Sequence, residues 1–364
     1  MPERVVVTIG TKKGLFVAEG AKTRGKFTLR GPFGAGVGVY STLTDLRGKT
    51  PTIYASSCNA WFGMKVLRST DLGRTFKETK SAPAFPKDDG RALANIWSLE
   101  PGEGERELLC GVEPASLFRS VDRGDSWALV PGISNHAHAK KWQPGAGGLC
   151  LHTIVRDHRG LHLGISTGGH YLSEDGGKTF AASNAGIGVG FQPVAYPEFG
   201  QCVHKLAAHP KAPGRLYLQN HGGVPDRPGI GVLRSDDHGH TWRSIAQGLP
   251  SDFGFPLAVH PHDPDTLYVV PLEPMTRTCP GGAPAVWRSE DGGASWGRLA
   301  RGLPKRDAYF TVLRDAMDID ALKSPALYVG TTTGQLWLGR DGGEAWTRVF
   351  DSLPPIYNVK VAVA

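Results

Sequence analysis

The sequence predicts an all-β fold, a seven-bladed β-propeller, on the strength of three observations. An octapeptide of the form S-x-D-x-G-x-[TS]-[WF] recurs along the 364 residues, at steps of about 50 to 60 residues. One four-stranded propeller blade needs ~40–55 residues, so each step corresponds to one blade. Glycine (49) and proline (27) are abundant, which fits many short strands joined by turns.

The octapeptide has the chemistry of a tight turn followed by a strand. Its Asp and Ser side chains can accept hydrogen bonds from nearby backbone N–H groups, and its glycine suits a positive φ. The aromatic residue at its end can bury a large area in a strand. We therefore interpret it as a folding device, present in five full copies and a degenerate sixth: Ser69–Phe76, Ser120–Trp127, Ser173–Phe180, Ser235–Trp242, Ser289–Trp296 and Gly339–Trp346.

These repeats resemble the Asp boxes, or BNR repeats, of sialidases, sortilin-type receptors, xyloglucanases and photosystem assembly factors. The resemblance covers nearly the whole chain and implies a propeller whose Asp boxes lie remote from the active face. It implies little about function, because these families share little chemistry. Sialidases need an arginine in an F/Y-R-I-P motif near the N-terminus, and the comparable stretch, Gly10–Phe16, has neither that arginine nor the proline. Sialidase activity is therefore not expected.

The blades can be placed in order along one domain, residues 1–364. The first is composite, because the strands in residues 5–29 lack an inner partner that the lone C-terminal strand, Tyr357–Val363, can supply. This closure leaves no sheet edge unpaired. The connections 82–93, 132–148, 184–201 and 271–284 are longer than a blade needs, and all emerge opposite the octapeptides. The expected blades are 1–30 plus 355–364, 37–82, 93–133, 148–185, 201–250, 254–304 and 308–353.

Composition argues against several classes of protein. The net charge is +7, but lysine and arginine are scattered, so we expect no nucleic-acid partner. No apolar run approaches the ~20 residues of a membrane-spanning helix. Residues 1–10 lack the features of a signal peptide, and the five cysteines are dispersed and odd in number. We therefore expect reduced cysteines and a cytoplasmic location.

Histidines gather at one predicted rim of the central channel. When the inner strands are aligned, His152 and His204 occupy equivalent positions in adjacent blades, and a His-x-His loop leads into the first of these strands. Imidazoles that converge in this way suit a divalent transition metal, although a metal-free polar pocket is the open alternative. No organic cofactor is indicated. The candidate metal ligands are His136, His138, His152, His204 and His221.

Other residues at this rim could act on or bind a substrate. Glu113 and Glu273 end two B strands and form the best-placed pair of carboxylates for glycoside hydrolysis, although a Glu-Pro strand end is also a common turn. Arg314 is a further catalytic candidate that could face the channel. The candidate substrate-binding residues are Tyr40, Asn95, Trp61, Trp142 and Arg277.

The function expected from this pattern is an enzyme, a hydrolase or metal-dependent enzyme that acts on a small polar, glycan-like molecule at the channel mouth. The alternative is a binding or scaffolding propeller that recognises a peptide or protein on the same face. An enzyme should show a concave pocket with histidine or glutamate of perturbed pKa. A binding protein should instead show an exposed apolar patch.

Overall fold

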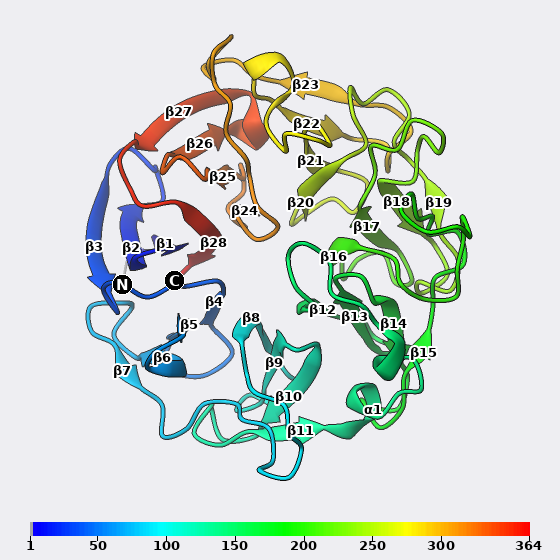
Figure 1. The fold of residues 1–364 in the computed structure, drawn as a ribbon. Helices are drawn as coiled ribbons and strands as arrows, with labels where there is room; N and C mark the ends of the chain where they lie inside the picture. Colours follow the sequence, from blue (N-terminus) through cyan, green and yellow to red (C-terminus); the bar gives the residue numbers. More distant parts are fainter. Residues whose placement is uncertain (1–2) are drawn as a thin grey trace.

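The predicted propeller is confirmed. The computed structural model describes residues 3–364 and contains seven four-stranded antiparallel sheets arranged as blades around a central axis (Figure 1). In the part of the chain that the structure describes, helix is confined to short turns. They are one α-helix, α1 (Pro131–Ser134), and three 3₁₀ turns, η1 (Ala139–Lys141), η2 (Pro280–Gly282) and η3 (Asp341–Gly343).

Blade 1 closes the propeller with strands from both ends of the chain. Strand β28 pairs with β1 along nearly its full length, from Val5 opposite Val363 to Thr11 opposite Ile356. The two ends of the chain therefore lie side by side in Figure 1. The strands of this blade, from the axis outwards, are β28 (Ile356–Val363), β1 (Arg4–Thr11), β2 (Gly14–Ala21) and β3 (Phe27–Phe33).

The other six blades each use four consecutive strands. Blade 2 contains β4 (Thr42–Asp45), β5 (Thr52–Asn59), β6 (Gly63–Ser69) and β7 (Lys77–Glu78). Blade 3 contains β8 (Asn95–Pro101), β9 (Leu108–Glu113), β10 (Ser116–Ser120) and β11 (Ala128–Val130). Blade 4 contains β12 (Leu151–Arg156), β13 (Leu161–Ile165), β14 (Gly169–Ser173) and β15 (Ala181–Ala182).

Blade 5 contains β16 (Val203–Ala208), β17 (Leu216–Asn220), β18 (Val232–Ser235) and β19 (Arg243–Ser244). Blade 6 contains β20 (Gly254–Val259), β21 (Leu267–Pro271), β22 (Val286–Ser289) and β23 (Gly297–Leu299). Blade 7 contains β24 (Met317–Ile319), β25 (Leu327–Gly330), β26 (Leu336–Arg340) and β27 (Ala345–Phe350).

Each full octapeptide closes a turn between the third and fourth strands of its blade. In blade 6 the Ser289 hydroxyl donates to Asp291 Oδ1 at 2.7 Å, and the N–H and hydroxyl of Ser295 donate to the same carboxylate at 2.9 and 2.6 Å. The degenerate copy has no serine at its start. There, Asp341 accepts a hydrogen bond from the hydroxyl of Ser324, which comes from the preceding turn, at 2.8 Å. The octapeptide turns define one face of the propeller, which we call the octapeptide face.

The opposite face, which we call the pocket face, carries the connections from second to third strand and from blade to blade. The four segments that the sequence predicts as elaborated loops follow β7, β11, β15 and β21, and the connection from β23 to β24, residues 300–316, is longer than two of them. All four lie on one side because strand direction alternates within each blade. The pocket face is therefore built from long loops, and the octapeptide face from short turns.

A buried histidine should make the fold sensitive to acid. His170 on β14 is fully buried, and burial, together with the neighbouring His162, lowers its pKa from 6.5 to about 3. In the unfolded chain the same imidazole takes up a proton near pH 6.5. Between pH 6.5 and about 3 the unfolded state therefore binds more protons, and the free energy of unfolding falls as the pH is lowered.

At pH 4.5 this one group is expected to reduce the free energy of unfolding by about 2–3 kcal/mol relative to pH 7.5. Urea unfolding curves at the two pH values measure the loss. His170→Phe removes the titrating group and should show a smaller difference between them. If His170→Phe loses as much free energy of unfolding between pH 7.5 and pH 4.5 as the parent does, His170 is not the group responsible.

Candidate active site at the channel mouth

A pocket of about 350 Å³ opens on the pocket face between blades 4, 5, 6 and 7. Four of the predicted site residues line it: His204, His221, Arg277 and Arg314. They come from the start of β16 and from three separate loops, so the tertiary fold alone brings them together. The remaining lining residues are Gly145, Ala146, Gly147, Ser166, Thr167, Phe191, Cys202, Phe255 and Leu313.

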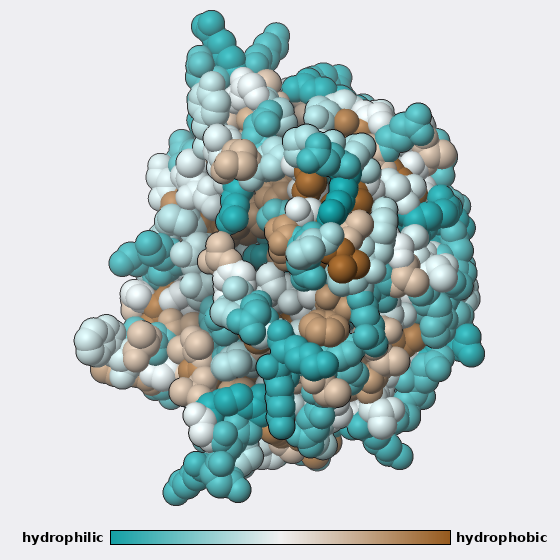
Figure 2. All heavy atoms as spheres, turned by 45° about the vertical axis from the view of Figure 1, so that its right-hand side comes forward, coloured by the Kyte–Doolittle hydropathy of each residue, from teal (hydrophilic) through white to brown (hydrophobic). Residues whose placement is uncertain are grey.

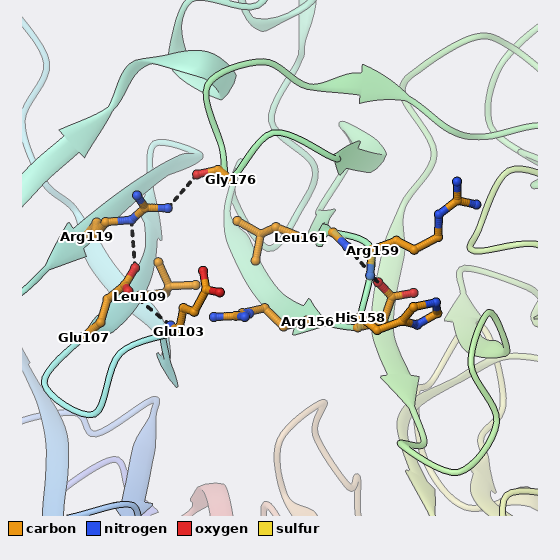
Figure 3. A pocket seen from close by; sticks show the side chains of 11 residues that line it. Glu103, Glu107, Leu109, Arg119, Arg156, His158, Arg159, Leu161 and Gly176 are labelled. Atoms are coloured by element: carbon orange, nitrogen blue, oxygen red, sulfur yellow. Dashed lines mark hydrogen bonds and ion pairs between the residues drawn. The ribbon is translucent and has the colours of Figure 1, made fainter.

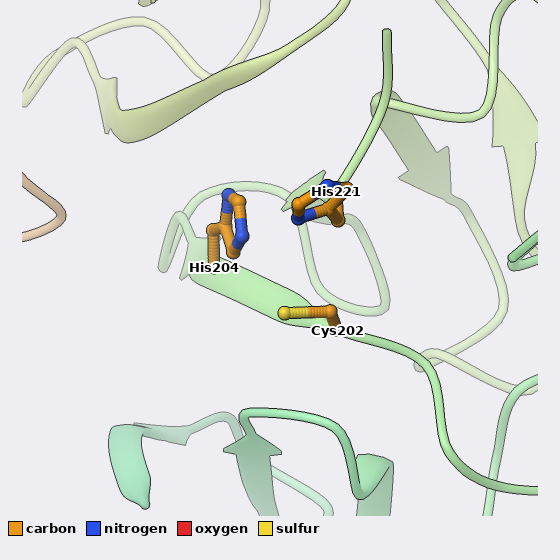
Figure 4. Close-up of side chains that lie close together, drawn as sticks. All are labelled: Cys202, His204 and His221. Carbon is orange, nitrogen blue, oxygen red and sulfur yellow. The ribbon is translucent and has the colours of Figure 1, made fainter. Parts of the chain in front are cut away.

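Cys202, His204 and His221 form the most concentrated group of ligand-type side chains in this pocket. One donor atom from each lies within 4.8 Å of the other two, and Figure 4 shows the three side chains around a common space. His204 Nδ1 donates to the carbonyl of Gly254 at 2.6 Å. That hydrogen bond fixes the tautomer of the neutral ring and leaves the Nε2 lone pair available, as it does for metal-ligating histidines.

The electrostatics of the pocket keep both imidazoles neutral. Burial, and then the positive charge of Arg314, lowers the pKa of His204 well below its usual value. Burial, and then Arg277 and Arg314, also lowers the pKa of His221. A neutral imidazole can accept a proton or ligate a metal, which a protonated one cannot do.

The two arginines supply positive charge at the walls of the pocket. The Arg314 guanidinium lies 5.2 Å from the centre of the Phe255 ring, and its buried Nε has no hydrogen-bond partner. Arg277 is exposed on the loop between β21 and β22. A buried guanidinium nitrogen without an acceptor leaves a donor unsatisfied, which a bound polar ligand could satisfy.

His152 lies deeper in the channel than the sequence alignment suggests. It is fully buried, Nδ1 contacts the Thr153 hydroxyl at 3.1 Å, and Nε2 has no hydrogen-bond partner. Lys205 and Asp315 form an ion pair close to it. Burial opposes ionisation of Asp315, but Lys205 and then Lys360 lower its pKa. This part of the channel is a network of buried charges rather than an open site.

Glu113, Asn95 and Tyr40 lie together beside the pocket. Asn95 is opposite Glu113 in the sheet, and Glu113 Oε2 accepts a hydrogen bond from Trp97 Nε1 at 2.9 Å. The Tyr40 ring lies 4.9 Å from the Trp97 ring, and burial raises the pKa of Tyr40 to about 12. The Glu113 carboxylate also packs on Gly148, where a Cβ would lie only 2.1 Å from Oε1. The Glu113 carboxylate therefore lies against the turn whose residues Gly145 and Gly147 line the pocket. Glu113 itself does not line the pocket.

The other predicted carboxylate occupies a different hollow. Glu273 is exposed and lines a cavity of about 580 Å³ with Asp252 and the 223–229 loop. The structure therefore does not place Glu113 and Glu273 in one pocket. Trp61 is 90% exposed at the tip of the loop between β5 and β6, outside the 350 Å³ pocket.

Three candidates at the loop before β12 belong to the core of blade 4. Trp142 is buried and donates from Nε1 to the Tyr171 hydroxyl at 3.0 Å, so it is a packing residue and not a wall of the pocket. His138 contacts the same hydroxyl at 3.1 Å and stacks on Phe199, while His136 lies against His138 and Tyr171. The loop turns outwards over its own blade, where Trp142 packs into the apolar core beside Tyr171.

Sequence reasoning missed Cys202 and Phe191. The first could have been found, because Cys202 and His204 are two residues apart at the start of a strand, where alternate side chains share a face. Phe191 lies in a long loop without periodicity, and nothing in its local sequence indicates that it reaches the pocket. Each of the five cysteines is unpaired within residues 3–364.

Comparisons with known proteins find relatives among the xyloglucanases. No family model matches this chain. A xyloglucanase from Paenibacillus sp. is 28% identical over 297 residues, which cover 73% of this chain and 26% of that enzyme. A probable oligoxyloglucan-reducing end-specific xyloglucanase from Neosartorya fischeri is 28% identical over 274 residues, which cover 67% of this chain and 31% of that one. This chain is similar to xyloglucanases.

A solved structure supports the fold. The GH74 xyloglucanase from Xanthomonas campestris matches with a TM-score of 0.66 and 21% identity, over 96% of this chain and 52% of that one. At this identity the likeness concerns the fold alone. The chain spans about a quarter to a third of the length of the two curated relatives it matches.

The remaining expectations about the chain's surroundings stay predictions: a cytoplasmic location, and no nucleic-acid or membrane partner. Within residues 3–364, none of the helices has the length and apolar character needed to cross a bilayer.

Proposed function

We propose that this protein is a hydrolase of small polar, glycan-like molecules and that the 350 Å³ pocket at the channel mouth is its active site. The observation that carries the proposal is the convergence of two neutral imidazoles, a thiol and two guanidinium groups in one pocket with aromatic walls. The similarity to xyloglucanases supports a glycan-type substrate. Membership of the Asp-box superfamily is part of the proposal, supported by the carboxylate-closed turns.

The pocket has parts suited to binding a sugar. The rings of Phe191 and Phe255 offer apolar surfaces against which the C–H face of a sugar ring can pack. Arg314 and Arg277 provide donors for hydroxyl or acidic groups. Arg314 is also placed to stabilise negative charge that develops on a leaving oxygen.

Water activation in this proposal uses the Cys202, His204 and His221 group. One thiolate and two imidazoles with an open fourth position match the donors of a catalytic zinc site. When bound there, a divalent ion would supply Lewis-acid polarisation of a water molecule. The two-carboxylate mechanism has less support, because Glu113 and Glu273 line different parts of the pocket face.

The test joins a metal assay to a substrate assay. Untagged protein is analysed for metal, then incubated with xyloglucan oligosaccharides and a panel of aryl glycosides, with and without a chelator. We expect bound metal, hydrolysis that the chelator abolishes, and, in Cys202→Ser, loss of hydrolysis together with one metal ion per chain. Activity that survives both chelation and Cys202→Ser would remove the metal from the proposal. Absence of hydrolysis by the metal-loaded protein on the whole panel would overturn the enzyme assignment.

A binding propeller is the second candidate, favoured by the distribution of exposed apolar side chains. Of the nine large exposed hydrophobic residues within residues 3–364, seven lie on loops of the pocket face. Figure 2 shows apolar patches around a hollow on an otherwise polar surface. The seven are Trp61, Phe62, Phe191, Val194, Tyr196, Met275 and Tyr309. A peptide partner should then be lost in Trp61→Ser with Phe62→Ser, and the parent protein should hydrolyse none of the glycosides on the panel.

A further inference from the structure

A second group of ligand-type side chains lies on the octapeptide face, at the junction of blades 4 and 5. Asp157 and His158 follow β12, and His238 lies in the octapeptide turn after β18. One donor atom from each of the three lies within 4.8 Å of the other two. This group lies on the opposite side of the propeller from the proposed active site and has no part in the proposed reaction.

A chain of buried hydrogen bonds leads from the core of blade 4 to Asp157. His170 Nδ1 contacts the carbonyl oxygen of Ser183 at 2.9 Å, and His170 Nε2 contacts His162 Nδ1 at 3.1 Å. His162 Nε2 then points at Asp157 Oδ2 from 3.5 Å. Both imidazoles are fully buried, so water does not interrupt this series of hydrogen bonds.

Hydrogen-bond chemistry restricts where the protons of these two imidazoles can lie. A carbonyl oxygen only accepts, so His170 must carry its proton on Nδ1. A neutral imidazole that carries its proton on Nδ1 has an acceptor at Nε2. His162 Nδ1 must therefore donate to it. If His162 is also neutral, its Nε2 carries a lone pair and faces a carboxylate oxygen, which is another acceptor.

Two acceptors that face each other in a buried place repel, unless a positive charge lies between them. His162 Nε2 indeed makes no hydrogen bond. The other oxygen, Asp157 Oδ1, is already held by the N–H groups of Arg159 and Gly160, each at 2.8 Å. Oδ2 instead faces two ring nitrogens, His238 Nδ1 at 2.9 Å and His162 Nε2 at 3.5 Å, and it is the oxygen at which a cation could replace the hydrogen bond to His238.

The donors around Oδ2 suit a first-row divalent ion. His238 Nδ1 lies 2.9 Å from Oδ2, and the rings of His158 and His238 are 4.7 Å apart. Ligand atoms about 2.0–2.2 Å from a tetrahedral zinc ion lie roughly 3.3–3.5 Å from one another. The three donor atoms here all lie within 4.8 Å of one another. The site is reached from a surface hollow of about 240 Å³, with His158 at one end of the row of labelled side chains in Figure 3.

We infer that Asp157, His158 and His238, with His162 Nε2 behind them, form a binding site for a divalent cation of the zinc type. Bound there, the ion would join the first turn of blade 4 to the octapeptide turn of blade 5. It would also satisfy the lone pair that the His170–His162 chain directs at the carboxylate.

The experiment uses the full chain with Cys202→Ser and His221→Gln, which remove donors from the pocket on the other face. Zn²⁺ and Co²⁺ are titrated by calorimetry and by the visible absorption of Co²⁺. We expect one ion per chain, a higher Tm with Zn²⁺, and affinity at least tenfold weaker in His158→Gln. His158 is exposed, so its replacement should not prevent folding. The matched control is His240→Gln, an exposed histidine two residues after His238, which should bind as the background protein does.

Equal affinity in His158→Gln and His240→Gln, or no ion bound by the background protein, would overturn the inference. Nitrogen NMR of His162 gives an independent test. A ring protonated on both nitrogens at pH 7.5, and unchanged by Zn²⁺, would show that a proton already neutralises the contact with Asp157, and the inference would again be wrong.

Discussion

Replacing Asp320 with alanine is expected to lower the free energy of unfolding by about 3–5 kcal/mol. Its carboxylate is fully buried and accepts two hydrogen bonds from Arg24, at 2.8 and 2.6 Å, and one from the Tyr328 hydroxyl at 3.1 Å. Arg24 belongs to blade 1 and Asp320 to blade 7, so the pair joins the closing blade to its neighbour. Removing the carboxylate leaves a guanidinium buried without its counter-charge.

Urea unfolding of the purified variant measures this loss, and the chain offers a matched control. Lys65 and Glu78 form an exposed ion pair at 2.6 Å, for which Glu78→Ala should cost less than about 1 kcal/mol. Arg24→Leu combined with Asp320→Leu should recover much of the stability, because it removes both buried charges. If Asp320→Ala lowers the free energy of unfolding no more than Glu78→Ala does, the Arg24–Asp320 pair does not stabilise the contact between blades 1 and 7.

Arg314→Met is expected to reduce kcat/KM on a polar substrate about 10- to 100-fold while leaving Tm unchanged or higher. A hydrogen bond to a charged group contributes ~1.5–3 kcal/mol, which corresponds to that factor in rate. Stability should not fall, because the Arg314 Nε is buried without a partner and methionine has no such donor to satisfy. Loss of activity without loss of stability is the signature of a residue that acts on the substrate.

Steady-state kinetics and thermal unfolding of the same preparations test this prediction. Arg306→Met, which changes a highly exposed arginine outside the pocket, is the control and should alter neither quantity. Arg314→Lys keeps the charge but not the planar guanidinium, so it should restore part of the activity. A parallel fall of activity and Tm in Arg314→Met would instead assign the residue a structural role.

The sequence by itself determined the architecture. The octapeptide turns follow from local sequence, because each full copy closes its turn with its own serine, aspartate and glycine and needs no distant contact. The closure of the propeller also followed from the sequence, since strands without partners at both ends can satisfy their backbone groups only by pairing. Even the shared face of Cys202 and His204 follows from strand periodicity.

Only the tertiary structure decided which polar residues meet. His221, Arg277 and Arg314 come from loops of three blades, and their convergence depends on how each loop folds over the rim. His136, His138 and Trp142 have the same residue types as a site, but apolar burial against Tyr171 and Phe199 carries them into the core of blade 4. The His170–His162–Asp157 series of contacts lies within blade 4, but the sequence does not reveal it, because the three side chains meet only when the strands of the blade pair. Local hydrogen bonding fixed the repeat, whereas long-range burial and electrostatics placed the side chains that could do chemistry.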